Sequence, residues 1–357
     1  MSDRLHSSID RLNPAQRDAV TAQGVPLLVL AGPGSGKTRV ITHRIAYLIG
    51  PMGYSSASIL AVTFTNKAAR EMTDRLRVLI PGDHQYLTVG TFHAICARIL
   101  RRDGAAIGIA RTFTIADDDD QESMVRRAIK DLELDDKRNP PRAFMSRISA
   151  AKSKLIDPGT YLLTAENYLD ELVAKVYERY QGALAGANLL DFDDLLGQTV
   201  RLFREVPRVL DSYQEKYRHL LVDEFQDTNI AQYALVRLLG SANRSVCVVG
   251  DEDQSVYSWR QADIRNILNF EIDFPDARLI VLEQNYRSSR TILQAARAII
   301  SPNRERKDKK LFTENEPGER IVVFEAYDEN EEANYVVAQI ERAVAAGVVR
   351  LGEIAVM

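Results

Sequence analysis

A glycine-rich segment is the clearest candidate for chemistry in this chain. Its sequence is Ala31-Gly32-Pro33-Gly34-Ser35-Gly36-Lys37-Thr38, between an apolar run at Pro26–Leu30 and a helical pattern over Arg39–Leu48. Glycines let backbone N–H groups turn toward a phosphate, and a helix N-terminus adds favourable partial charge. In such a P-loop Lys37 pairs with the β and γ phosphates, and the Thr38 hydroxyl ligates Mg²⁺. The segment therefore predicts a nucleotide site.

Two other interpretations of this segment are weaker. A glycine-rich turn with a chance lysine would not need a strand before it and a helix after it, and the sequence predicts both. A dinucleotide-binding turn requires the spacing G-x-G-x-x-G, whereas here Lys37 and Thr38 directly follow the last glycine. The one departure from the strict P-loop is Ala31 in place of its first glycine.

Acidic residues at a second strand end complement the P-loop. The run Leu220–Val222 leads into Asp223 and Glu224. Such an Asp anchors Mg²⁺, and the adjacent Glu can act as a general base on water. Acids are common at strand ends, so this pair gains its meaning from the P-loop in the same expected sheet. Gln254, after the run Val246–Gly250, is placed to sense the γ-phosphate, although a solvated loop amide is the ordinary interpretation.

The elements that would hold these residues alternate between strands and helices. Short apolar runs predict strands at Pro26–Leu30, Ile59–Phe64, Leu87–Thr91, His219–Val222, Val246–Gly250 and Leu279–Leu282. Helical spacing lies between several of them, as in Ala68–Leu79 and Ala94–Arg101. This alternation predicts an α/β fold with a parallel sheet and helices on both faces.

The pattern changes twice along the chain. From Asp117 to about Ala187 it is helical and charged, which predicts a helical domain inserted between sheet strands. After Leu282 the pattern predicts a helix at Ser288–Ile300, a strand at Arg320–Glu325 and a helix at Asn330–Ala346. The last residues, Ile354–Met357, look like the start of a strand, and a domain that ended there would leave backbone groups unpaired. We therefore expect a truncated product or a fragment.

Bulk composition excludes some classes of protein. The chain has 357 residues, 45% of them apolar, and a net charge of −4. Attraction to nucleic acid must therefore be local, because overall attraction to phosphate is absent. No apolar run approaches the ~20 residues that cross a bilayer, and no signal peptide is recognisable. Cys96 and Cys247 are expected to be buried thiols of a cytoplasmic protein with no membrane partner.

The remaining motifs separate P-loop classes. They run from Leu12–Gln16 through Ala31–Thr38, Ala61–Ala69, Gly90–His93, Val222–Thr228 and Val249–Arg260 to Leu282–Ser288. In this order they resemble the UvrD/PcrA/Rep group of superfamily 1 DNA helicases. The resemblance extends to the last residue and implies a RecA-like domain at 1–108 and 188–282. It also implies an inserted helical domain at 109–187 and the beginning of a second RecA-like domain at 283–357.

The resemblance assigns roles in the nucleotide site. Gln16 would read the adenine edge, Tyr286 would stack on the base, and Arg39 would lie near the nucleoside. Arg287 would reach the γ-phosphate as an arginine finger, and Gln254 would couple the phosphate to the DNA side. The full expected site also includes Gly32, Pro33, Gly34, Ser35, Gly36, Lys37, Thr38, Asp223 and Glu224, with ATP and Mg²⁺ as cofactors.

A DNA track is plausible from residue type as well. Single strands stack their bases on aromatic faces at roughly 1–3 kcal/mol per base. Such faces would come from Phe64, Tyr257 and Trp259, of which Phe64 and Trp259 would otherwise be ordinary core aromatics. Backbone contacts would come from Thr65, Asn66, Thr91, His93 and Arg260, and His93 could equally be a satisfied polar residue near a helix start.

The resemblance implies an ATP-dependent 3′–5′ DNA helicase or translocase motor, acting on single strands and duplex junctions with repair or replication proteins. Later motor motifs are absent, so we expect this chain alone not to unwind DNA. Two alternatives remain: the motor of a helicase–nuclease recombination subunit, and a non-enzymatic ATP- or DNA-binding fragment. A P-loop kinase would not need the aromatics beside the sheet.

Three charged clusters have simpler interpretations. Asp117–Asp120 could bind a metal, but acids also favour a helix N-terminus. Asp191, Asp193 and Asp194 are expected to cap the next helix. Arg304–Lys310 could touch duplex DNA, but a solvated charged face is the default.

Overall fold

The computed structural model describes residues 2–82, 84–135, 137–257, 261–303 and 309–357. Its centre is a six-stranded parallel sheet with the strand order β3-β2-β6-β7-β1-β8. The strands are β1 (Leu27–Ala31), β2 (Ile59–Thr63), β3 (Thr88–Thr91), β6 (His219–Val222), β7 (Val246–Gly250) and β8 (Arg278–Leu282). In register, Leu28 of β1 lies between Val248 of β7 and Leu279 of β8. The predicted α/β class with a parallel sheet is confirmed.

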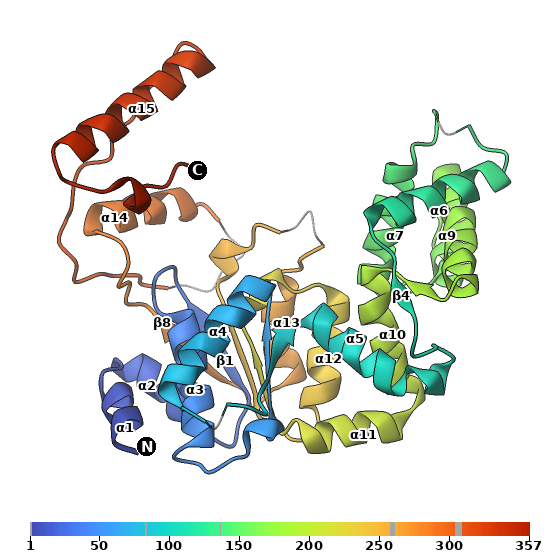
Figure 1. Cartoon of the computed structure of the whole chain (residues 1–357), viewed down its shortest axis with the longest axis horizontal. Coiled ribbons are helices and arrows are strands. Elements are labelled where there is room, and N and C mark those ends of the chain that lie inside the picture. The colour runs from blue at the N-terminus through green and yellow to red at the C-terminus, as the bar shows by residue number, and fades with distance from the viewer. Residues whose placement is uncertain (1, 83, 136, 258–260, 304–308) are drawn as a thin grey trace.

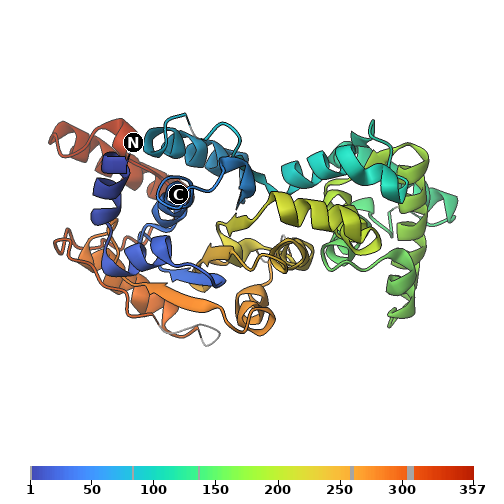
Figure 2. The same ribbon diagram turned by 90° about the horizontal axis from the view of Figure 1, so that it is seen from below.

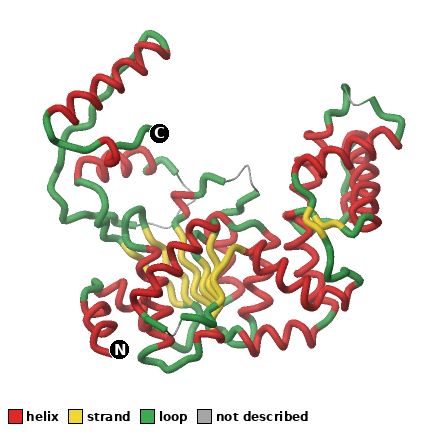
Figure 3. Tube along the Cα trace, in the orientation of Figure 1, coloured by secondary structure: helices red, strands yellow, loops and turns green. Residues whose placement is uncertain are grey.

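Helices cover both faces of this sheet (Figures 1 and 3). One face packs against α1 (Ser2–Asp10), α2 (Pro14–Thr21), α3 (Lys37–Ile49) and α4 (Asn66–Leu79). The other packs against α5 (Phe92–Asp103), α10 (Phe192–Glu205), α11 (Pro207–Lys216), α12 (Ile230–Gly240) and α13 (Arg265–Asp273). Successive strand residues point to opposite faces, so Leu28 and Leu30 join one core while Leu27 and Val29 join the other. Because both faces are buried, the strands are almost wholly apolar.

The parallel arrangement determines where the candidate site residues meet. All six strands run the same way, so their carboxyl ends lie at one edge of the sheet. β1 ends at the P-loop, β2 at Phe64, β6 at Asp223, β7 at Asp251 and β8 at Glu283. Ligands of open α/β sheets bind outside this edge.

A helical insertion stands beside the sheet (Figure 1; Figure 2 shows it away from the C-terminal helices). It contains α6 (Asp118–Asp131), α7 (Pro141–Ser153), α8 (Pro158–Leu163) and α9 (Tyr168–Gly186), with a hydrophobic cluster of its own. A short parallel pair, β4 (Thr114–Ile115) and β5 (Leu189–Leu190), closes its base. The Asp117 carboxylate accepts from the Asp120 N–H in a capping box, as expected for acids at a helix N-terminus. Among the described residues, no cluster of three His, Cys, Asp or Glu side chains suits a metal ion.

The described C-terminal residues form two α-helices, α14 (Arg290–Ile300) and α15 (Glu329–Ala345), and a short 3₁₀ helix at Leu351–Glu353. The strand predicted at Arg320–Glu325 is wrong, and so is a strand start at Ile354–Met357, because neither segment forms a ladder in the described structure. The apolar pattern of both segments is compatible with a strand, but a strand also needs a neighbouring strand to satisfy its backbone groups. Val322 and Val323 are instead largely exposed. In the described chain, every helix is too short or too polar to traverse a bilayer.

Candidate nucleotide and nucleic-acid site

The P-loop has the backbone geometry that its glycines predict. Gly34 and Gly36 adopt positive φ angles of 65° and 90°, a region that favours glycine, and Gly36 is the N-cap of α3. The Ser35 hydroxyl donates to the Gly32 carbonyl at 2.6 Å and tightens the turn. Backbone N–H groups at the start of α3 therefore face the carboxyl edge of the sheet, where an anion would gain from the helix dipole.

Lys37 lies at the centre of the polar site. Its Nζ donates to Gln254 Oε1 at 3.0 Å and lies 3.4 Å from Glu224 Oε2. The P-loop, the end of β6 and the turn after β7 thus meet at one ammonium group. An incoming γ-phosphate is the kind of group that could replace both oxygens around Lys37.

The two acids after β6 differ in their surroundings. Asp223 is buried, and burial together with the charge of Glu224 raises its pKa to about 7. Glu224 is partly exposed and adopts a positive φ of 48°, which is uncommon for a residue with a side chain. This turn directs the Glu224 carboxylate toward Lys37, the position from which a base could reach water near a phosphate.

Gln226 is a site residue to which the sequence assigned no role. Its Nε2 donates to Glu224 Oε2 at 2.9 Å, and its Oε1 accepts from the Asp251 N–H at 3.0 Å. A Cβ on Gly250 would come within 2.9 Å of Gln226 Oε1, so the close approach requires glycine there. Gln226 therefore joins the ends of β6 and β7, but a single buried amide leaves no pattern in a sequence.

The segment after β8 packs directly on the P-loop. The Tyr286 N–H donates to the Gly34 carbonyl at 2.9 Å, and Asn285 Nδ2 donates to the Pro33 carbonyl at 2.7 Å. Asn285 Oδ1 accepts from the Arg287 N–H, which fixes the turn that carries Arg287. The exposed Arg287 side chain begins beside Gly34, since a Cβ on Gly34 would lie 2.7 Å from Arg287 Cβ. The residues predicted as base-stacking and finger groups therefore border the P-loop.

The expected nucleoside residues Gln16 and Arg39 also border this loop, since both would meet a Cβ on Gly36. Asn13 and Gln16 form the capping box of α2, and Gln16 Nε2 donates to the Ser35 carbonyl at 2.8 Å. Asn13 Nδ2 also donates to the Tyr286 hydroxyl at 2.8 Å. Arg39 is half-buried on α3, and its guanidinium lies 3.4 Å from the Arg11 carbonyl. Gln16 therefore supports the P-loop backbone in this structure.

The donor set suits a magnesium ion. Thr38 lies in the first turn of α3, and the buried Asp223 directly follows β6. Their hydroxyl and carboxylate oxygens are hard ligands of the kind that Mg²⁺ prefers. When bound, the ion would neutralise phosphate charge. The role of the protein residues is to hold these oxygens at the carboxyl edge of the sheet.

A hollow of about 420 Å³ lies between the sheet edge and the insertion. Phe64, Thr91 and His93 line it together with Phe192 at the start of α10. The Phe64 ring lies 5.0 Å from the Tyr257 ring, and the His93 ring lies edge-on to Phe192 at 5.9 Å. Burial lowers the pKa of His93, which favours the neutral ring. The half-exposed Phe192 was not singled out in the sequence, because it stands among capping acids.

The other predicted DNA residues have mixed positions. Thr65 and Thr91 are N-caps, with hydroxyls that accept from the N–H groups of Ala68 and Ala94. Each hydroxyl still has an O–H to donate. Asn66 is exposed at the first turn of α4. Trp259 and Arg260 lie outside the described residues.

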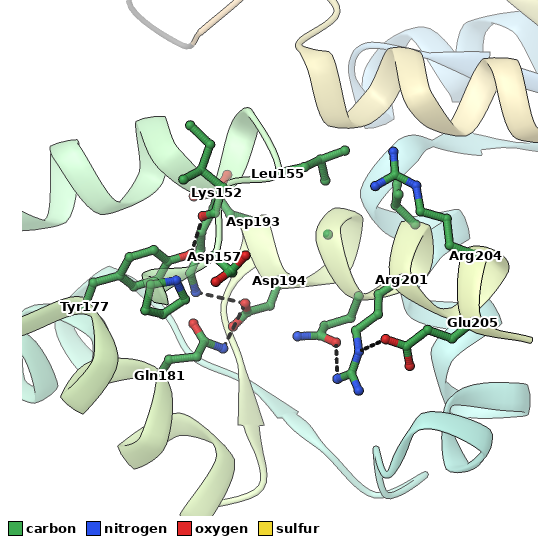
Figure 4. A pocket seen from close by; sticks show the side chains of 15 residues that line it. Lys152, Leu155, Asp157, Tyr177, Gln181, Asp193, Asp194, Arg201, Arg204 and Glu205 are labelled. Atoms are coloured by element: carbon green, nitrogen blue, oxygen red, sulfur yellow. Dashed lines mark hydrogen bonds and ion pairs between the residues drawn. The ribbon is translucent and has the colours of Figure 1, made fainter. Parts of the chain in front are cut away.

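A buried ion-pair cluster fixes the insertion to the sheet domain. Lys152 of α7 donates to Asp191 Oδ2 at 2.6 Å and to Asp194 Oδ1 at 2.8 Å, and all three side chains are about 5% exposed or less. Tyr180 donates to Asp191 as well, at 2.8 Å. Figure 4 shows Lys152 and Gln181 directed at the Asp194 carboxylate, beside a hollow of about 540 Å³. Asp191 caps α10 as expected, but its partner Lys152 was not foreseen.

These features define a P-loop nucleotide-binding fold with an extended helical insertion. A family model described as the UvrD/REP helicase N-terminal domain matches residues 12–275, and one described as the UvrD-like helicase C-terminal domain matches residues 280–357. The chain belongs to the UvrD/REP helicase family, and the predicted resemblance is confirmed.

The curated relatives that match this chain are named DNA helicases. An ATP-dependent DNA helicase PcrA from Staphylococcus aureus is 49% identical over 336 residues, which cover 94% of this chain and 46% of that protein. The PcrA of Staphylococcus epidermidis is 48% identical with the same coverage. These relatives are enzymes by name. The chain spans about half the length of the curated relatives that it matches.

Proposed function

We propose that this chain binds ATP with Mg²⁺ and couples it to single-stranded DNA, as the nucleotide-binding part of an ATP-dependent 3′–5′ DNA helicase or translocase. Lys37, Thr38, Asp223 and Glu224 form the phosphate, metal and base positions. Gln16, Arg39, Tyr286 and Arg287 border the nucleoside and γ-phosphate. The proposed place of action is the cytoplasm, on DNA strands and junctions, and the proposed domain division is the one expected from the sequence.

The observation that carries this proposal is the convergence on Lys37. Its ammonium contacts Gln254 at 3.0 Å and Glu224 at 3.4 Å, and these groups come from separate strand ends. A purely structural glycine turn would not need a sensor-like amide and an acid to meet at its lysine. The adjoining aromatic hollow supports the DNA half of the proposal, because stacking needs exposed π faces.

Equilibrium binding of a fluorescent ATP analogue with Mg²⁺ tests the nucleotide half. Lys37→Ala should weaken binding roughly 10- to 100-fold, the value of a hydrogen bond to a charged group. Lys175→Ala, which alters an exposed lysine of α9, should leave binding unchanged. Equal affinity in the wild type and the Lys37 variant would contradict the proposal.

Removing the Phe64 ring should weaken binding of a single-stranded oligonucleotide. One lost stacking face costs roughly 1–3 kcal/mol, or about 5- to 150-fold in Kd. Fluorescence anisotropy with labelled oligothymidylate measures the change in Phe64→Ala. The matched control is Tyr86→Ala, because the exposed Tyr86 precedes β3 and so lies at the opposite edge of the sheet. Equal losses in both variants would count against a base-stacking role.

The hollow also predicts a pH dependence of DNA binding. Burial raises the pKa of Asp193 and Asp227, which line it, to about 6. Below this pH both carboxyls become neutral and repel phosphates less, so affinity should rise as pH falls from 7.5 to 5.5. Asp193→Asn removes one of these charges. The change in binding free energy between pH 7.5 and pH 5.5 should therefore be smaller in this variant, by about 1 kcal/mol at most. A slope identical in wild type and variant would disprove the role of Asp193.

A further inference from the structure

Lys309 is a fully buried lysine in the part of the chain matched by the C-terminal-domain model. Its Nζ lies 2.5 Å from Asp251 Oδ1, 3.0 Å from Glu252 Oε2 and 3.4 Å from Asp253 Oδ2. The expectation of a solvated face across Arg304–Lys310 is wrong for Lys309, and residues 304–308 lie outside the described structure. The three acids follow β7 in the part matched by the N-terminal-domain model, so this contact joins the two matched regions.

The segment that carries Lys309 is held in place by its own contacts. The Lys310 N–H donates to Glu283 Oε1 at 2.7 Å, and Phe312 exchanges backbone hydrogen bonds with Glu283 and Asn285. Leu311 is buried against the P-loop, because a Cβ on Gly32 would come within 2.3 Å of its Cδ2. Lys309 therefore belongs to a segment fixed in place, residues 309–312, which we call the strap.

The cluster continues from Lys309 to the phosphate site. Asp251 accepts from Lys309 through one oxygen and from Gln254 Nε2 through the other, at 2.5 Å in both cases. Gln254 Oε1 then accepts from Lys37. Asp251 thus bridges Lys309 and Gln254: Oδ1 accepts from Lys309, and Oδ2 holds the amide whose Oε1 faces the P-loop lysine. Burial disfavours the charged lysine, but its carboxylate partners, Asp251 foremost, outweigh this and raise the pKa of Lys309.

We propose that Lys309 is a positioning residue that links the strap to the γ-phosphate sensor. It holds Asp251, Asp251 holds Gln254, and Gln254 contacts Lys37. When the strap is seated, the Gln254 amide is oriented for a γ-phosphate, and when the strap is displaced, the buried Asp251 carboxylate loses the Lys309 ammonium that holds it in place. This inference rests on the proposed function for its γ-phosphate readout, but the link itself does not depend on nucleotide.

A competition assay on the 357-residue chain tests the sensor half of the proposal. The ratio of ADP to AMP-PNP dissociation constants measures discrimination of the γ-phosphate. Gln254→Ala should lower this ratio roughly 10-fold or more, as expected for a lost hydrogen bond to a charged group, and Lys309→Met should do the same. The double variant should be no worse than either single variant, because both act through one amide. The control is Lys310→Met, whose exposed side chain lies outside the cluster.

Additive losses in the double variant would overturn the relay and leave Lys309 with a merely structural role. A wild-type chain that binds ADP and AMP-PNP equally would overturn it as well. A wild-type chain with no Lys37-dependent nucleotide binding would instead refute the proposed function.

Thermal unfolding tests the link in every one of these cases. Lys309→Met should lower Tm while Lys310→Met does not, and Asp251→Asn should recover part of that loss because it removes an uncompensated charge. If Lys309→Met melts like Lys310→Met, the proposal fails whatever the nucleotide results. If Lys309→Met does not fold, the double variant Lys309→Met/Asp251→Asn is tested instead, and it should recover folding. A double variant that recovers no folding would contradict the Lys309–Asp251 link.

Discussion

Glu224→Gln should lower ATP hydrolysis by about 10²- to 10⁴-fold, the usual contribution of general base catalysis. ATP affinity should stay equal or increase, because the substitution removes a negative charge 3.4 Å from Lys37. A glutamine carbonyl can still accept the hydrogen bond that Gln226 donates, so the turn should remain folded. Steady-state hydrolysis and equilibrium nucleotide binding, measured on the same preparation, separate the two effects.

Glu215→Gln is a matched control for this substitution. Glu215 is exposed on α11, and the same change of charge there should leave hydrolysis within error of the wild type. If Glu224→Gln hydrolysed ATP within about threefold of the wild-type rate, the general base would have to be another group.

Lys152→Met should destabilise the fold by roughly 3–5 kcal/mol at pH 8, since it leaves two buried carboxylates without their cation. Asp191 and Asp194 contact Lys152 at 2.6 and 2.8 Å, whereas Tyr180 and Gln181, which also donate to them, carry no compensating charge. Urea unfolding followed by circular dichroism measures the difference. The insertion should loosen first, because Lys152 joins α7 to the start of α10.

The same variant has a defined pH response. Burial raises the pKa of Asp194 to about 6 even beside Lys152, and loss of the lysine should raise it further. A carboxyl whose pKa is higher in the folded state binds more protons when folded than when unfolded. It therefore stabilises the fold at low pH, and this stabilisation is lost as the pH rises through the pKa of the folded state. The penalty of Lys152→Met should therefore shrink toward pH 5. Lys154→Met, at the exposed C-cap of α7, should show neither effect, and a penalty independent of pH would contradict the ion-pair account.

Much of the fold followed from the sequence because the strands are buried on both faces. Runs such as His219–Val222 and Val246–Gly250 are apolar between their first and last residues. The bounds of both strands were predicted as observed. β4 and β5 were not predicted, since two residues carry no periodic pattern. Strand order also could not be predicted, because it depends on pairing between distant segments. The strand predicted at Arg320–Glu325 is absent because an apolar pattern alone forms no strand without a neighbouring strand to pair with.

The candidate site was predictable where its residues directly follow strands. Lys37, Asp223, Glu224 and Gln254 lie at the ends of β1, β6 and β7, and the parallel sheet brings them together; their catalytic roles stay predictions. Asn285 and Gln226 were not assigned because a single amide looks the same in a loop and in a core. Lys309 lies within a charged run and 58 residues from Asp251, so only the folded chain shows their contact.

Steady-state ATP hydrolysis by the 357-residue chain, with and without a single-stranded oligonucleotide and beside Lys37→Ala, tests the central claim most directly. The proposed coupling predicts hydrolysis that the oligonucleotide stimulates and that Lys37→Ala abolishes. Hydrolysis that persists in Lys37→Ala, or a wild-type rate that does not respond to the oligonucleotide, would contradict a P-loop site coupled to single-stranded DNA.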